Sequence, residues 1–359
     1  MKKASLGDIA RIAGVSRMTV SCAMRNSPRV KAETREEIHR IARELNFIPD
    51  ARMARLMEGV REAKSKEPLP IAWLNTGKHE DAWRRFRWLY PYYEGARDRC
   101  AELGYKLDEI WLKTPEMNSR RISNILYHRG ITGVIVCPSL ESLTHLRLNW
   151  SRFASVTFER AILAPRLHRV AHDYFYNMLL ALKMLRRFGY RRIGVFMQQL
   201  TERKSFHGYI SGLWYFHADV DTAERVSPLI YRHVDEIKGD GRKFREWLDG
   251  ERPDVVVGHH SELVNWLRAA GRKVPEEIGV VHLAMEDDCA EWAGIWSRKR
   301  EIGAQVVEQL VTAMHNNNFG LPTVSHDLLI GGYWKAGATL LVPKPSRPHQ
   351  KASRTRKAR

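Results

Sequence analysis

The segment from residue 4 to residue 30, ASLGDIARIAGVSRMTVSCAMRNSPRV, constrains the fold more than any other part of the chain. A first short helix is predicted by four apolar residues at the spacing of one helix face, Leu6, Ile9, Ala10 and Ala13. Ser5 can cap this helix, Gly14 ends it, and Ser16 can cap a second helix in which Val20 faces the first. Two helices that meet at a short glycine turn leave the outer side of the second one free to enter the roughly 12 Å major groove of DNA. The pattern therefore predicts a helix-turn-helix.

A third helix is predicted immediately downstream, in ETREEIHRIARELNF at residues 33 to 47. Its apolar positions again share one helix face: Ile38, Ile41, Ala42 and Leu45. Short helical pairs also occur in enzymes and helical bundles. The turn, the third helix and the hinge segment follow in order, which favours a small three-helix DNA-binding module.

The same residues carry a family resemblance. DIARIAGVSRMTVS, then PRVKAETREEIHRIARELNFIPD, and then Leu56 seven residues beyond Pro49 resemble the amino-terminal module of the LacI family of bacterial transcription regulators. The resemblance covers residues 4 to 57. It implies a DNA-binding domain over residues 1–58 that ends in a hinge helix at residues 50–58.

The resemblance also implies roles for single residues. Arg17 and Met18 match the positions that choose bases, and Thr19 and Ser21 match positions that contact phosphate. Cys22 replaces the usual Arg, Arg25 the usual Asn, and Lys31 a Ser that would cap the third helix, so the operator need not resemble the usual one. The residues expected at the DNA are Ser5, Ser16, Arg17, Met18, Thr19, Ser21, Cys22, Arg25, Arg29, Met53 and Leu56.

The hinge segment DARMARLME is too short to persist as a helix in water, so we expect it to fold only on DNA. By resemblance, Leu56 is the apolar wedge that opens a base step in the minor groove. Met53 and Ala54 stand where the family usually has Ala and Arg, which predicts a wider contact between paired hinges. The alternative is that Leu56 packs against the rest of the protein.

Beyond a polar linker at residues 59–70, the pattern alternates strand and helix. Strands are predicted at 71–75, 133–137, 153–157, 192–196, 254–258 and 279–283. Short continuous apolar strands that alternate with amphipathic helices indicate parallel sheets covered on both faces. We therefore expect an α/β body over residues 71–340, built of two doubly wound parallel-sheet subdomains. This body resembles the periplasmic-binding-protein-like effector domain of the same family.

In that family, an Arg, an Asn-Asp pair and an Asp grip sugar hydroxyls in the cleft of the body. The matching positions here are approximately Ser205, His259 with His260, and Ala284, which puts a usual pentose or hexose ligand in doubt. The aromatic run at residues 83–93 either stacks on a planar or sugar ligand or packs in the core. The candidate effector residues are Trp83, Phe86, Ser205, His259, His260, Ala284 and Trp296.

The net charge of +18 is concentrated at the ends of the chain. Residues 1–67 hold 15 Lys and Arg against 9 Asp and Glu, and residues 342–359 hold 7 basic and no acidic residues. This distribution suits a polyanionic partner. The basic tail, residues 341–359, is expected to be either a solvated, disordered extension or a nonspecific nucleic-acid contact.

Other features limit the class of protein. The four cysteines form no CxxC pair, and no signal peptide or apolar run of about 18 residues is recognised, so we expect a cytoplasmic protein with reduced thiols and no membrane partner. The adjacent histidines make a poor metal pair, and no phosphate loop, GxSxG or HExxH motif occurs. We expect no cofactor, no metal and no enzymatic activity.

Together these observations predict a homodimeric, sequence-specific DNA-binding transcription regulator, a repressor of a palindromic operator. A small, sugar-like molecule bound in the body would modulate it. The alternative is a DNA-binding protein whose body is a dimerisation scaffold that senses no ligand.

Overall fold

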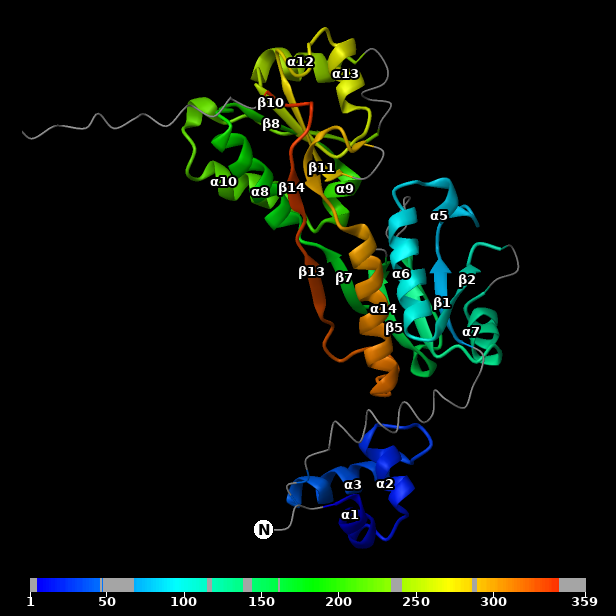
Figure 1. Cartoon of the computed structure of the whole chain (residues 1–359). Coiled ribbons are helices and arrows are strands. Elements are labelled where there is room, and N and C mark those ends of the chain that lie inside the picture. Colours follow the sequence, from blue (N-terminus) through cyan, green and yellow to red (C-terminus); the bar gives the residue numbers. More distant parts are fainter. Residues whose placement is uncertain are drawn as a thin grey trace, which may run out of the picture. The chain divides into compact units, whose positions relative to one another are not determined.

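The computed structural model describes residues 5–45, 47, 68–114, 118–137, 144–160, 162–233, 241–285 and 289–341 (Figure 1). The chain divides into two compact units. Unit 1 comprises Met1–His172 and Arg298–Ile330, and unit 2 comprises Asp173–Ser297 and Gly331–Arg359. The chain therefore passes from one unit to the other after His172, after Ser297 and after Ile330.

Three helices at the start of the chain form a small core of their own. They are α1 (Leu6–Ile12), α2 (Arg17–Met24) and α3 (Ala32–Glu44). Each helix contributes fully or almost fully buried apolar side chains, among them Ile9, Val20, Ala23, Ile38 and Ile41. The three helices predicted from apolar spacing are thus confirmed.

The larger part of unit 1 is a six-stranded parallel sheet in the order β13-β7-β5-β3-β1-β2. Its strands are β1 (Leu69–Asn75), β2 (Tyr105–Trp111), β3 (Gly133–Val136), β5 (Ala154–Phe158), β7 (His168–His172) and β13 (Asp327–Ile330). The helical elements are α5 (Ala82–Arg85), α6 (Tyr90–Glu102), α7 (Ser119–His128), η1 (Trp150–Arg152) and α14 (Lys299–His315). Two short strands, β4 (Thr144–His145) and β6 (Ile162–Ala164), pair separately.

The side chains of β1 point alternately to the two faces of this sheet, which explains why helices cover both faces. Ile71 and Trp73 belong to one core cluster with side chains of α6 and α14, whereas Ala72 and Leu74 belong to another with side chains of α7. Successive side chains of a strand point to opposite faces, so a fully apolar strand needs helices on both.

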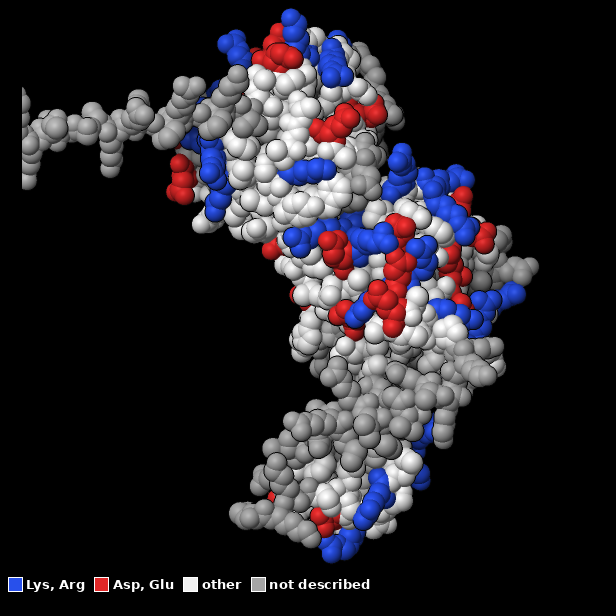
Figure 2. Space-filling model, viewed as in Figure 1, with Lys and Arg blue, Asp and Glu red and all other residues white. Residues whose placement is uncertain are grey.

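Helices α6 and α14 cross closely because glycines stand at the contact. A Cβ built on Gly95 would lie 1.9 Å from the carbonyl oxygen of Arg300, and one built on Gly303 would lie 2.2 Å from the carbonyl oxygen of Tyr92. The outer surface of this helix pair is a mosaic of opposite charges (Figure 2), in which Arg99 pairs with Glu308 at 2.9 Å.

Unit 2 has a second six-stranded sheet in the order β14-β12-β11-β10-β8-β9, parallel except for the antiparallel edge strand β14. Its strands are β8 (Ile193–Gln198), β9 (Leu229–Tyr231), β10 (Val255–Gly258), β11 (Gly279–Met285), β12 (Ala293–Trp296) and β14 (Tyr333–Lys335). Its helical elements are α8 (Tyr174–Arg187), α9 (Gln199–Lys204), α10 (Gly208–His217), η2 (Thr222–Glu224), α12 (Arg242–Glu251) and α13 (Leu263–Ala269).

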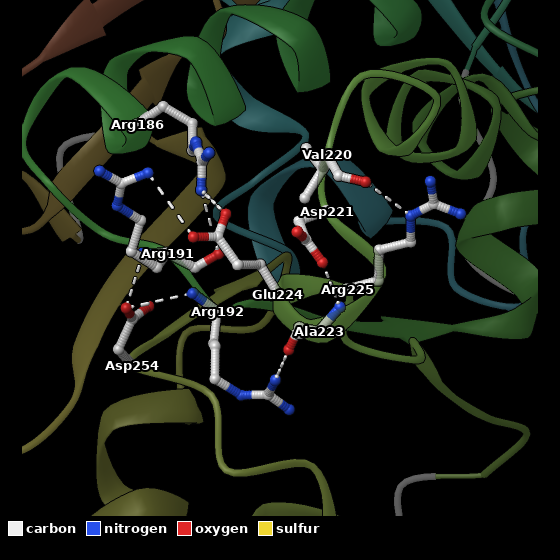
Figure 3. Close-up of polar contacts among 9 residues, drawn as sticks. All are labelled: Arg186, Arg191, Arg192, Val220, Asp221, Ala223, Glu224, Arg225 and Asp254. Atoms are coloured by element: carbon white, nitrogen blue, oxygen red, sulfur yellow. Dashed lines mark hydrogen bonds and ion pairs between the residues drawn. The ribbon is translucent and has the colours of Figure 1, made fainter.

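An arginine-rich network ties the amino-terminal ends of β8 and β10 together (Figure 3). Asp254, just before β10, accepts hydrogen bonds from the backbone N–H groups of Arg191 and Arg192 at 2.7 and 3.1 Å. The Arg192 guanidinium donates to the carbonyl of Ala223 in η2. Arg186 of α8 pairs with Glu224 at 2.5 Å. These bonds satisfy backbone groups where the strands begin.

Each strand predicted from a continuous apolar run is confirmed, as β1, β3, β5, β8, β10 and β11. The expected α/β body with two mainly parallel sheets is also confirmed. Within the described parts of the chain, no helix is both long and apolar enough to span a bilayer.

Candidate nucleic-acid interface and effector residues

Local hydrogen bonds fix where α1 and α2 begin. Ser5 and Asp8 form a capping box, in which the Ser5 hydroxyl accepts from the Asp8 amide at 3.3 Å and the Asp8 carboxylate accepts from the Ser5 amide at 3.0 Å. Ser16 caps α2 by accepting from the Thr19 amide at 3.0 Å. Between the helices, Gly14 adopts a φ of +63°, which favours glycine. Both predicted caps and the glycine turn are therefore present.

The burial of Val20 and Ala23 determines which side of α2 faces outward. Both side chains are fully buried against α1 and α3, so the opposite side of the helix is free. Arg17 is exposed there, and Met18 has 63% of its surface exposed. Thr19 is half-buried, with its hydroxyl 2.8 Å from that of Ser16.

Residues at the end of α2 are more constrained than those at its start. Arg25 donates from Nε to the carbonyl of Ser21 at 3.0 Å, which holds its side chain along the helix. Cys22 is half-buried against the three-helix core. Arg29 is exposed. Met53 and Leu56, which the sequence assigns to the DNA, lie outside the described residues.

Helix α3 begins without a side-chain cap. Lys31 occupies the N-cap position, and no side chain accepts a hydrogen bond from the first amides of the helix. A Ser, Thr, Asp or Asn would normally do so. The predicted loss of the cap at Lys31 is confirmed.

In unit 1, Trp83 lies within the short helix α5 and Phe86 directly follows that helix. Trp83 is 9% exposed, stacks on Tyr93 with ring centroids 3.7 Å apart, and donates from its indole nitrogen to Glu109. The Tyr93 hydroxyl donates to the same carboxylate at 2.8 Å, and burial together with that carboxylate holds the pKa of Tyr93 above its usual range. Phe86 is half-buried, 5.9 Å from the ring of His79.

In unit 2, four of the other candidate residues lie at or near the carboxyl-terminal ends of parallel strands, and Ser205 lies at the end of a helix. Ser205 follows α9, is 3% exposed and donates to the carbonyl of Glu202. His259 and His260 directly follow β10, and the two rings contact different neighbours, Tyr209 and Trp266 respectively. Ala284 is buried within β11, and Trp296 ends β12 with the Lys335 ammonium 4.6 Å from its ring centroid.

The structure adds residues that sequence reasoning missed at this edge. The ring of His282 lies 5.7 Å from that of His259 and 5.8 Å from that of Trp292, and its Nδ1 accepts from the Ala284 amide at 3.2 Å. His282 interrupts an apolar strand, and that polar residue was the available signal. The imidazole ring of His282 thus lies beside Ala284 and contacts that of His259, at positions where the family motif has charged groups. Within the described ranges, no group of three or more His, Cys, Asp or Glu is placed to hold a metal ion.

The amino-terminal module resembles known proteins in sequence. Residues 5–50 match the family described as bacterial regulatory proteins, lacI family. The sucrose operon repressors of Shigella flexneri and Escherichia coli are each 42% identical over 69 residues, or 19% of this chain and 19% of theirs. The match therefore spans about a fifth of the length of these curated relatives.

Solved structures resemble nearly the whole chain in fold. A lac repressor dimer bound to operator and the anti-inducer ONPF gives a TM-score of 0.55 at 17% identity, over 95% of this chain and 100% of that chain. A complex of the transcriptional regulator CelR with cellobiose gives 0.54 at 18% identity, over 94% and 99%. A periplasmic binding protein/LacI transcriptional regulator from Alkaliphilus metalliredigens, complexed with D-xylulofuranose, gives 0.55 at 12% identity, over 76% and 99%.

Proposed function

Because residues 5–50 match the lacI family of bacterial regulatory proteins, we propose that the chain is a member of this family and a sequence-specific transcription regulator that acts as a repressor. The observation that carries this proposal is the geometry of α2. Its inner side is anchored by Val20 and Ala23, and its outer side presents Arg17 and Met18 to solvent. A helix held in this way can lie in a major groove with its amino-terminal side chains at the base edges.

The protein binds a palindromic operator as a homodimer in this proposal. One three-helix module reads only a few base pairs, whereas two modules related by a two-fold axis read half-sites about one helical turn apart. Arg17 is the base reader, and its contact with a guanine is worth about 1–3 kcal/mol of discrimination. Leu56 is the minor-groove wedge, and opening a base step costs a few kcal/mol that the contacts of bent DNA offset.

The α/β body binds a small-molecule effector, which we place in the carbohydrate class. Support comes from His259, which directly follows β10 at the edge where open parallel sheets bind ligands, and whose ring contacts those of Tyr209 and His282. Aromatic faces can pack against the apolar faces of a sugar. An effector changes DNA affinity only if it binds the two conformations of the body unequally.

A second candidate is a body that serves only for dimerisation. It is favoured by Ser205 and Ala284, which offer no charged group at the sugar-gripping positions. A thermal-shift screen of the full chain against sugars and nucleosides separates the two candidates. A ligand that raises the melting temperature and changes operator affinity supports the effector role, and a screen with no such ligand supports the scaffold.

The central test is selection from a random duplex library by the full-length protein at physiological salt, followed by sequencing of the bound fraction. An enriched palindrome is the expected result. Binding without enrichment that collapses as salt rises would show that phosphate contacts alone hold the DNA, and would refute sequence-specific regulation.

A further inference from the structure

Gly7 and Arg17 meet at the amino-terminal ends of α1 and α2. A Cβ built on Gly7 would lie 3.0 Å from both Nε and Nη2 of Arg17 and 3.2 Å from Cζ. The guanidinium group of Arg17 therefore lies against the backbone of α1 at the point where α1 has no side chain. A Cβ contact of this length is closer than ordinary van der Waals packing.

The Arg17 guanidinium makes this contact without using its hydrogen-bond donors. In the described part of the chain, no group accepts a hydrogen bond or forms an ion pair with it. The nearest acid in sequence to Gly7 is Asp8, whose carboxylate is taken up by the Ser5 amide and hydroxyl and by Arg11 at 2.5 Å. The donors of Arg17 thus remain available for a base edge.

We propose that Gly7 is a positioning residue for base recognition, because its bare backbone provides the surface against which Arg17 rests before it meets DNA. The inference rests on the proposed function and adds a determinant of specificity on α1, outside the reading helix. An arginine side chain loses considerable rotamer freedom when it is fixed. Resting against α1 reduces the number of conformations that must be given up on binding, which favours the correct contact.

Gly7→Ala is the direct test. The added methyl lies 3.0 Å from Nε and Nη2, so the guanidinium must shift by a few tenths of an ångström, and we expect the preference at the base read by Arg17 to fall by roughly three- to tenfold. This is a part of the about 5- to 150-fold discrimination of a bidentate base contact. Alanine also favours a helix over glycine, so weaker discrimination cannot be assigned to an unfolded α1.

A double-mutant cycle supplies the matched control. Wild type, Gly7→Ala, Arg17→Ala and the double variant are each used to select duplexes from the same library, and the position where Arg17→Ala loses preference identifies the base in question. The expected result is that Gly7→Ala weakens the preference at that position alone and has no effect on it in the Arg17→Ala background. The salt dependence of binding stays unchanged, since no phosphate contact is removed.

Two results overturn the inference while the proposed function stands. One is an unchanged base preference in Gly7→Ala, and the other is an equal effect of Gly7→Ala with and without Arg17. If the wild-type chain itself enriches no sequence, the proposed function fails and the inference fails with it.

Discussion

Glu202 is a buried acidic side chain in unit 2. It is 3% exposed, and neither carboxylate oxygen has a hydrogen bond of good geometry from a described residue. The Nδ1 atom of His207 lies 3.8 Å from Oε2 of Glu202. Burial raises the pKa of Glu202 to about 7, and the nearby Ile210 amide lowers it only in part. Phe206 and His207 both have positive φ, so backbone strain coincides with the buried acid.

Glu202→Gln should stabilise the protein in a pH-dependent way. The pKa is about 7 in the folded chain against an ordinary 4.5, so the folded state binds the extra proton between these values. The wild type therefore loses stability as pH rises from about 4.5 to about 7, at about 1.4 kcal/mol per pKa unit of difference. We expect the Gln variant to be more stable by about 3 kcal/mol at pH 8 and by little at pH 4.5, as measured by urea unfolding.

Glu246→Gln on the exposed side of α12 is the control for this comparison, since its side chain is 68% exposed. It should follow the pH profile of the wild type. A Glu202→Gln profile that also follows the wild type would show that the carboxylate is solvated in solution.

Some of these residues could be predicted from the sequence and others could not. The capping roles of Ser5 and Ser16 could be predicted, because each hydroxyl accepts a hydrogen bond from an amide only three residues further along the chain. The burial of Glu202 and the ring contacts of His282 could not, because both depend on how separate elements pack, although His282 itself stands out as a polar residue in an apolar strand. Gly7 was not recognised either, since its effect depends on where the Arg17 side chain lies.

Among the helices, α3 has a defect that one substitution can repair. Lys31→Ser should stabilise the three-helix module by about 1 kcal/mol, because the hydroxyl would accept from an amide in the first turn that has no side-chain partner. The measurement is the melting of the module within the full chain. Lys31→Ala removes the same charge without adding an acceptor, and an equal gain from Ala would show that charge rather than capping is responsible.

The crossing of α6 and α14 should tolerate no side chain at its glycines. Gly303→Ala would place a methyl 2.2 Å from the Tyr92 carbonyl oxygen, which forces the two helices apart. We expect a loss of roughly 1–3 kcal/mol in unfolding free energy.

Gly250→Ala is the matched substitution, since Gly250 lies within α12 and a Cβ there would meet nothing within 4 Å. It should instead raise stability by about 0.5–1 kcal/mol through helix propensity. Similar effects of the two substitutions, by denaturant titration, would show that the α6–α14 contact is loose.

Strands were predictable where they form continuous apolar runs, as in β1, β3, β5, β8, β10 and β11. The inner strands β7, which contains His168, Arg169 and His172, and β12, which has only four residues, were not predicted. Strand β2 contains Lys106, Asp108 and Glu109 and lies at a sheet edge, and β13 at the opposite edge alternates exposed and half-buried residues. Such edge strands are half solvated and lack a continuous apolar signal, so the sequence did not predict them.

At the level of the whole molecule, the three-helix module has a hydrophobic core distinct from the cores of the two sheets. We therefore expect calorimetry of the full chain to show a separate transition for the module. About 40 residues correspond to an unfolding enthalpy of about 30 kcal/mol. Operator DNA binds only the folded module, so it should raise the temperature of this transition.

Random-sequence duplex of equal length is the control, and it should raise that temperature less. Unfolding of the whole chain in one transition, with or without DNA, would mean that the module depends on the sheets for its stability.

The order in which the chain crosses between its units has a consequence for synthesis on the ribosome. Unit 1 requires α14 and β13, and unit 2 requires β14, all of which lie in the last quarter of the sequence. The core of the three-helix module, in contrast, is made entirely from residues 6–47. The nascent chain can thus fold its three-helix module early. Both sheets can be completed only after the last segments have emerged from the ribosome. A chain that ends before residue 298 would therefore contain a complete three-helix module joined to two incomplete sheets.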